Sequence, residues 1–236
     1  MSMRVDVWSD IACPWCYVGK RRLEAALKEA ASKGGGGGEV EVVWRAFELD
    51  PRAPRVYPGD ESYSQRLARK YGTTEEEGAA MCERMTGVAA EEGLRFRFDR
   101  IQPGNTFDAH RLLHLARERG KQDALKERLL AAYFEEGEAI SDHAVLERLA
   151  ESVGLDAEEV RETLASDRFA TAVRGDEGLA GELGIRGVPF FVVNGRYAVS
   201  GAQPAELLAR VLTEAVGTEP QSLPEGEACG PDGCAI

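Results

Sequence analysis

The sequence contains no apolar run that approaches the roughly 20 residues a helix needs to cross a bilayer. It also has no apolar leader, since Met1-Ser2-Met3-Arg4 leads directly into a predicted strand. We therefore expect no membrane association and a cytoplasmic location, where most thiols are kept reduced. In that compartment the five cysteines are better explained by chemistry than by a structural disulfide framework.

Positive charge is scarce as well. The chain has 29 Lys and Arg against 41 Asp and Glu, and its net charge is −12. The densest basic run, Lys20-Arg21-Arg22, falls on a predicted helix, where a solvated face is the ordinary interpretation. No clustered basic patch is present, so we expect no nucleic-acid partner.

Histidine and phosphate-binding patterns are equally sparse. His110 and His114 are four residues apart on one helical face, but Arg111 stands where the zinc-protease motif requires Glu. We assign both histidines to packing or to a pocket lining and predict no metal site. Glycines 34–38 lack the lysine and helix of a phosphate loop, and residues 184–187 precede a strand.

The informative motif is Cys13-Pro14-Trp15-Cys16, which follows an alternating strand at residues 4–8. Pro14 suits the first position of a helix, because that position makes no use of a backbone N–H. Apolar residues then recur at helical spacing: Val18, Leu23, Ala26, Leu27 and Ala30. The two cysteines are therefore predicted to lie at a helix N-terminus.

This position predicts a redox dithiol. A thiol at a helix N-terminus faces unpaired N–H groups and the positive end of the helix dipole, which favour the thiolate. We expect this environment to lower the pKa of Cys13, the attacking thiol, while Cys16 lies one turn further along and displaces it from a mixed disulfide. The alternatives are half of a zinc site and an inert pair.

The order of predicted elements indicates an α/β protein with a thioredoxin-like fold. A strand, a helix and a second strand at 40–47 form a parallel βαβ unit. Only helical patterning follows from 51 to 167, after which Asn194-Gly195 predicts a hairpin between 190–193 and 196–199. A final helix is expected near 204–216. We therefore divide the chain into a first thioredoxin-like half (1–50), a helical insertion domain (51–166), a second half (167–216) and a flexible tail (217–236).

The loop before this hairpin is the second functional signal. Pro189 cannot donate to a sheet ladder, so it belongs at a strand start or in a turn. In a thioredoxin-like architecture this loop lies beside the CxxC helix and contains a cis-proline, and we expect a cis bond between Val188 and Pro189. A trans proline at the strand start is the alternative. Val188 and Pro189 are predicted to face the substrate together with Pro14 and Trp15.

The chain resembles the DsbA-type thioredoxin-like oxidoreductases, in particular their FrnE-like branch. The resemblance extends from residue 4 to about 215 and rests on these segments: Ser9-Asp10, Cys13 to Gly19, Phe47 to Pro51, Asn105 to Arg111, Gly187 to Phe191 and Gly201-Ala202-Gln203. It implies thiol–disulfide exchange, as an oxidoreductase or disulfide isomerase, with Cys13 attacking and Cys16 resolving. It implies no cofactor, with glutathione as a redox partner, and disulfide-containing proteins or small thiols and disulfides as substrates.

Related proteins in the same structural group give the alternative function. These are the 2-hydroxychromene-2-carboxylate isomerases and kappa-class glutathione transferases, which share the Asn-Thr-x-x-Ala-His-Arg segment and use glutathione. They usually place serine where Cys13 stands, so the Cys13–Cys16 pair counts against this assignment.

Three cysteines lie outside the CxxC motif. Gly-Pro-Asp-Gly between Cys229 and Cys234 predicts a turn that brings these two thiols together. We predict a redox relay from this pair to Cys13 and Cys16. A separate disulfide, a solvent-exposed pair, or a four-cysteine zinc site made with Cys13 and Cys16 are the alternatives. Cys82, beside Met81 and Met85, is predicted to be a buried, inert thiol.

Overall fold

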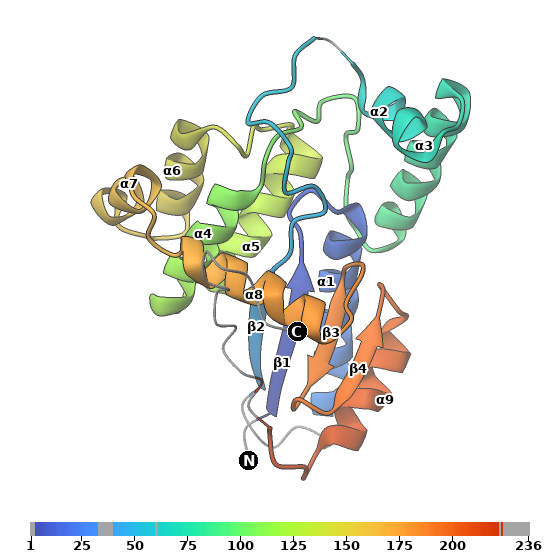
Figure 1. Ribbon diagram of the computed structural model, residues 1–236. Helices are drawn as coiled ribbons and strands as arrows, with labels where there is room; N and C mark the ends of the chain where they lie inside the picture. The colour runs from blue at the N-terminus through green and yellow to red at the C-terminus, as the bar shows by residue number, and fades with distance from the viewer. Residues whose placement is uncertain (1–2, 33–39, 60, 222, 224–236) are drawn as a thin grey trace.

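A four-stranded sheet forms the centre of the protein (Figure 1). The computed structural model describes residues 3–32, 40–59, 61–221 and 223. Within them, β1 (Met3–Ser9) pairs in parallel with β2 (Val40–Ala46) and antiparallel with β3 (Phe190–Val193), which pairs with β4 (Tyr197–Ser200). The strand order β2-β1-β3-β4 makes β1 a central strand. The predicted parallel βαβ unit is confirmed.

The predicted hairpin turn also forms as its sequence requires. Asn194 and Gly195 both adopt positive φ angles, 51° and 65°, and the Arg196 N–H donates to the Val193 carbonyl over 3.0 Å. The Asn194 side-chain oxygen accepts a hydrogen bond from the Arg4 N–H (2.9 Å), and its amide group donates to the Ala215 carbonyl (3.2 Å). One turn residue therefore connects β1 to the C-terminal helix.

Helices cover both faces of the sheet. On one face, α1 (Pro14–Ser32) and α9 (Ala205–Ala215) enclose an apolar core with Val5 and Val7 of β1. On the other face, α8 (Ala170–Glu182) packs over Trp8. Because both faces of β1 are covered, its residues are buried on both sides.

A buried ionic cluster joins α8 to the sheet. Arg45 of β2 is 3% exposed and donates to Asp6 of β1 (2.8 Å) and to Asp176 of α8 (2.9 Å). Asp176 also accepts from the Ala46 N–H (2.9 Å), and its carbonyl accepts from the Trp8 indole N–H (2.9 Å). These bonds give each buried charge a partner and fix α8 over β1 and β2.

The segment between the two halves of the sheet is helical. Its elements are α2 (Tyr63–Tyr71), α3 (Glu75–Glu91), α4 (Phe107–Glu118), α5 (Gln122–Ala131), the π-helical turn η1 (Ala132–Glu136), α6 (His143–Ser152) and α7 (Ala157–Ala165). Ser62 and Thr74 begin α2 and α3 with reciprocal capping boxes. Residues from α3 to α7 form one apolar core that also includes Ile11, Tyr17 and Val18, so this core packs against the start of α1.

This arrangement confirms the predicted α/β class and the thioredoxin-like fold with helices between its βαβ and ββα halves. The predicted domain boundaries at 50, 166 and 216 stay predictions. Within this segment, α5 changes into the π-helical turn η1 after Ala131. Among the described residues, no helix combines the length and apolar character that crossing a membrane requires.

Candidate active site

The CxxC motif lies where β1 ends and α1 begins. A tight turn follows Asp10, and the Cys16 N–H donates to the Cys13 carbonyl over 3.0 Å in the first turn of the helix. Cys13 is 5% exposed and Cys16 is fully buried, and both are free thiols. Cys13 is therefore the sulfur that a substrate can reach.

The loop before β3 contacts Cys13 directly. The Cys13 Sγ lies 3.5 Å from the Val188 carbonyl oxygen, and the Val188–Pro189 peptide bond is cis, as the sequence analysis expected. The Pro189 carbonyl accepts a hydrogen bond from the Gly201 N–H (2.8 Å), which attaches this loop to the end of β4. Two segments that are far apart in the sequence thus meet at Cys13.

Glycine at position 19 allows this approach. A β-carbon on Gly19 would lie 2.8 Å from Pro189 Cγ and 3.3 Å from Phe191 Cζ. Real β-carbons rarely come so close to other carbon atoms, because the contact is repulsive. The glycine therefore lets α1 pack against the loop.

Three ionisable side chains are buried beneath the two cysteines. The Lys126 Nζ of α5 donates to the Ser9 carbonyl (3.2 Å) and lies 5.6 Å from the centre of the Trp44 ring. The two carboxylate oxygens of Asp10 accept from the backbone N–H groups of Ala12 (3.3 Å) and Leu49 (2.8 Å). His110 Nε2 lies 3.5 Å from Asp10 Oδ1.

The thiol pKa values are set by the pair and its surroundings. The hydrogen bond to Cys16 raises the pKa of Cys13 well above its ordinary value, and burial acts in the same direction. Burial also raises the pKa of Cys16, but the hydrogen bond from Cys13 and the charge of Lys126 outweigh it, so the pKa of Cys16 is lowered. The predicted lowering of the Cys13 pKa is therefore wrong: the two thiols titrate as a coupled pair, in which the pKa is raised at Cys13 and lowered at Cys16.

The same buried environment also shifts the pKa of Lys126. Burial lowers its pKa to about 8, although the neighbouring Cys16 and Asp10 charges favour the protonated amine. Burial raises the pKa of Asp10, but the adjacent His110 and the charge of Lys126 contribute to a net lowering. At neutral pH a buried ammonium thus lies close to the Cys16 sulfur and to a buried carboxylate.

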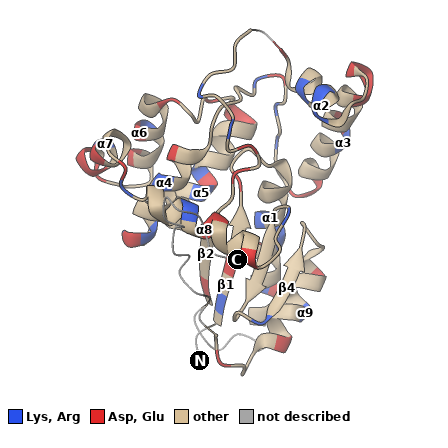
Figure 2. Ribbon diagram, viewed as in Figure 1, with Lys and Arg blue, Asp and Glu red and all other residues tan. Residues whose placement is uncertain are grey.

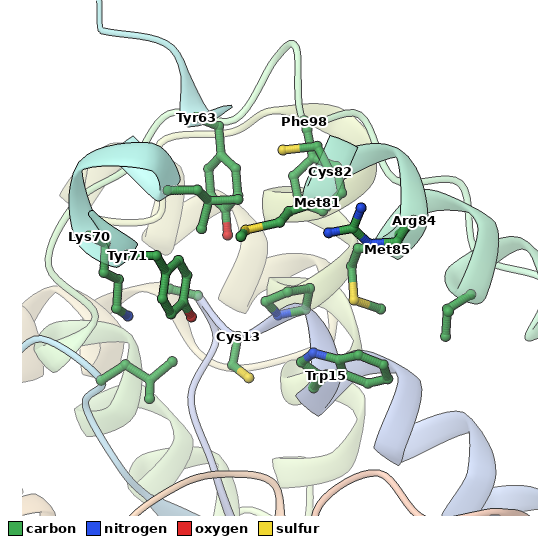
Figure 3. A pocket seen from close by; sticks show the side chains of 15 residues that line it. Cys13, Trp15, Tyr63, Lys70, Tyr71, Met81, Cys82, Arg84, Met85 and Phe98 are labelled. Atoms are coloured by element: carbon green, nitrogen blue, oxygen red, sulfur yellow. The ribbon is translucent and has the colours of Figure 1, made fainter. Parts of the chain in front are cut away.

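A cavity of about 500 Å³ opens above Cys13 (Figure 3). Its floor includes Ala12, Cys13, Pro14 and Trp15, and α2 and α3 supply much of its roof. Trp15 is 44% exposed and lines this cavity, and its substrate-facing role stays a prediction. Cys82 differs from its prediction, because it is half-buried and lines this cavity.

Sequence reasoning missed Lys126 and gave no role to Asp10. A usable signal was present for Lys126, which occupies the apolar stripe of α5 beside Leu125, Leu129 and Leu130. A lysine at such a position is buried, and buried lysines are rare without a function or a partner. The sequence pattern did not show that this stripe faces Cys16.

The other predicted residues are placed as follows. His110 lies beside Asp10 under the site, whereas His114 lines a separate cavity next to Asp176. Among the residues that the structure describes, no three His, Cys, Asp or Glu side chains converge as a metal site would require. Cys229 and Cys234, with the predicted relay and the four-cysteine zinc alternative, lie outside the described residues.

The sequence and this geometry together define a family. The chain belongs to the DSBA-like thioredoxin domain family, whose model matches residues 4–213. It is 47% identical to a probable DsbA oxidoreductase, SCO1869 from Streptomyces coelicolor, whose crystal structure matches with a TM-score of 0.83 over 99% of each chain.

Two further relatives extend the comparison. The chain is 29% identical over 217 residues to the uncharacterized protein YwbO of Bacillus subtilis (strain 168). The alignment covers 91% of this chain and 98% of that protein. The cytosolic disulfide reductase DsbM from Pseudomonas aeruginosa, solved with GSH, has the same fold at 18% identity, with a TM-score of 0.61 over 89% of this chain and 98% of that chain.

Proposed function

We propose that this protein is a thiol–disulfide oxidoreductase in which Cys13 is the nucleophile and Cys16 the resolving thiol. The observation that carries the proposal is the position of the Cys13 sulfur, at the floor of the cavity and 3.5 Å from the Val188 carbonyl. Membership of the DSBA-like family supports the same class of reaction. We also propose a cytoplasmic location, where glutathione serves as reductant and no resident cofactor is needed.

In the first step, Cys13 attacks a substrate disulfide. Its proton passes to the Cys16 thiolate, and its electron pair forms the new S–S bond of a mixed disulfide. The second substrate sulfur leaves with the electrons of the broken bond and takes a proton from water. The Val188 and Pro189 backbone lies beside the reacting sulfur and orients the substrate.

In the second step, Cys16 loses its proton to solvent and attacks the Cys13 sulfur. The Cys13–Cys16 disulfide forms and the remaining substrate sulfur leaves as a thiol. Two electrons have then passed from the pair to the substrate; of the two protons on the product thiols, one comes in balance from the Cys13 thiol and one from solvent. Lys126 stabilises the Cys16 thiolate in this step, because its ammonium is buried beside that sulfur.

The test is a redox titration in glutathione buffers, with thiols trapped by alkylation and each cysteine assigned by mass spectrometry. We expect one reversible two-electron transition at Cys13 and Cys16. The Cys16→Ser variant should retain a mixed disulfide on Cys13, and Cys13→Ser should retain none. Failure of Cys13 and Cys16 to form a disulfide would overturn the proposal and favour glutathione-adduct chemistry of the isomerase or transferase type.

The C-terminal relay is a separate proposal with its own test. Cys229 and Cys234 are proposed to exchange electrons with Cys13 and Cys16. Deletion of residues 226–236 is then expected to slow turnover with the reductant while leaving the first attack of Cys13 unchanged. Unaltered turnover in the deletion variant would exclude the relay.

A further inference from the structure

The charged residues that line the cavity above Cys13 are of one sign. Although acidic residues outnumber basic ones by 41 to 29, the described charged residues of this lining are Lys70 of α2 and Arg84 of α3. Figure 3 shows these two side chains on opposite sides of Cys13. A site with two cations and no acid in a protein of net charge −12 is selective for negative charge.

Both cations are free to bind a ligand. Lys70 lies 5.9 Å from the centre of the Tyr71 ring, and within the described part of the chain neither Lys70 nor Arg84 forms an ion pair. The nearby Arg69 differs, because it pairs with Glu61 at 3.0 Å. Basic residues colour parts of the α2 ribbon blue in Figure 2. The acidic residues of α3 are Glu75 to Glu77, Glu83 and Glu91, and none of them lines the cavity.

The remaining wall is apolar and soft. Thioether, aromatic and aliphatic side chains make up most of it: Leu49, Tyr63, Leu67, Tyr71, Met81, Met85, Val88 and Phe98. Methionines adapt to irregular shapes and make favourable contacts with aromatic rings. The volume of about 500 Å³ is in the range of small-molecule sites.

On the basis of the proposed function, we infer that the substrate is a small disulfide with an apolar or aromatic body and at least one anionic group. The apolar body packs between Trp15 and the α2–α3 roof, and the anion lies against Lys70 or Arg84. Cys13 and Cys16 reduce this disulfide to two thiols. A small thiol such as glutathione then reduces the Cys13–Cys16 disulfide and is itself oxidised to its disulfide.

The experiment measures the second-order rate constant of the reduced protein with three disulfides. These are 5,5′-dithiobis(2-nitrobenzoate), which is aromatic and anionic, 4,4′-dithiodipyridine, which is aromatic and neutral, and cystamine, which is cationic. The variants are Lys70→Gln and Arg84→Gln. Matched controls are Lys28→Gln and Arg95→Gln, since both residues are exposed, lie outside the lining and lose the same charge.

We expect the ratio of anionic to neutral rate constants to fall about three- to fivefold in each cavity variant, as for the loss of one exposed ion pair. The ratio of anionic to cationic rate constants should fall further. In Lys28→Gln and Arg95→Gln, both ratios should stay at the wild-type value. Equal losses in cavity and control variants, or no loss in either, would overturn the inference.

Two outcomes separate this inference from the function on which it rests. If the reduced protein reacts with none of the three disulfides, the proposed oxidoreductase function itself fails. If it reacts but the ratio of anionic to neutral rate constants in Lys70→Gln and Arg84→Gln stays at the wild-type value, only the substrate class fails. A fourth measurement uses glutathione disulfide, which is anionic but polar. A faster reaction with glutathione disulfide than with 5,5′-dithiobis(2-nitrobenzoate) would overturn the apolar part of the assignment.

Discussion

Gly19 of α1 lies against Pro189 with no room for a side chain, because a β-carbon at position 19 would stand 2.8 Å from Pro189 Cγ. The same loop presents the Val188 carbonyl to the Cys13 sulfur. The packing of one glycine therefore controls the distance between the nucleophile and the backbone beside which substrates are proposed to bind.

Gly19→Ala should destabilise the protein by about 1 to 3 kcal/mol, the usual cost of overpacking, and should slow the attack of Cys13. The control is Gly87→Ala on α3, where no atom lies within 4 Å of the added carbon. That change should stabilise by up to about 1 kcal/mol through helix propensity. Urea unfolding of both variants measures the difference, and equal stabilities would contradict the clash.

Lys126→Met should raise the pKa of the Cys16 thiolate, because the buried cation that stabilises it is lost. The absorbance of the thiolate near 240 nm, followed against pH, reports this shift. Where the thiolate is populated, the reduction potential should become more negative by roughly 30 mV for each pKa unit. Lys121→Met, an exposed lysine just before α5, is the control. An unchanged titration would assign Lys126 to packing alone.

Glu48→Gln should change the pH dependence of stability. The Glu48 side chain is fully buried, and burial raises its pKa to about 7 although Arg174 donates to it over 2.6 Å. Between about pH 4.3, its unfolded value, and pH 7 the native state binds more protons, so this group lowers stability as pH rises. The stability of the variant relative to wild type should therefore increase by roughly 2 to 3 kcal/mol from pH 4.5 to pH 8. Urea unfolding at both pH values measures it, and a constant difference would contradict the raised pKa.

Asp176→Asn should destabilise by about 3 kcal/mol at pH 7, because Arg45 loses one of its two buried carboxylate partners. Burial raises the pKa of Asp176, but His114, Arg45 and the Ala46 N–H lower it overall. Its contribution to stability is thus complete above about pH 3.9 and is lost as pH falls through the lower folded value. The difference in the free energy of unfolding between variant and wild type should be smaller at pH 3 than at pH 7. A difference that grows as the pH falls would exclude this role for Asp176.

Local patterns were enough to predict much of the fold. The Asn194-Gly195 turn and the position of Cys13 and Cys16 at the start of a helix follow from short-range chemistry, as does the position of the helices between the two halves of the sheet. The parallel pairing of β1 with β2 followed from the element order alone.

The residues that surround Cys13 and Cys16 could not be predicted from the sequence and became known only from the structure. The face of α5 that carries Lys126 is plain from its periodicity, but its contact with the site spans more than 100 residues of sequence. Met81, Met85 and Cys82 form a stripe like that of an ordinary core helix, yet this stripe lines a cavity. The wrong direction predicted for the Cys13 pKa has a similar origin. The helix-terminus argument treated Cys13 as an isolated thiol, whereas the neighbouring Cys16 raises its pKa.

The central position of β1 also has a consequence for synthesis on the ribosome. Cys13 and Cys16 follow the first strand, whereas β3, which pairs with that strand, is made about 170 residues later. At ordinary translation rates of about 5 to 20 residues per second, the nascent dithiol waits roughly 10 to 30 s for the loop at Val188. During that interval the thiols are protected by the redox state of the surrounding solution and not by their own fold.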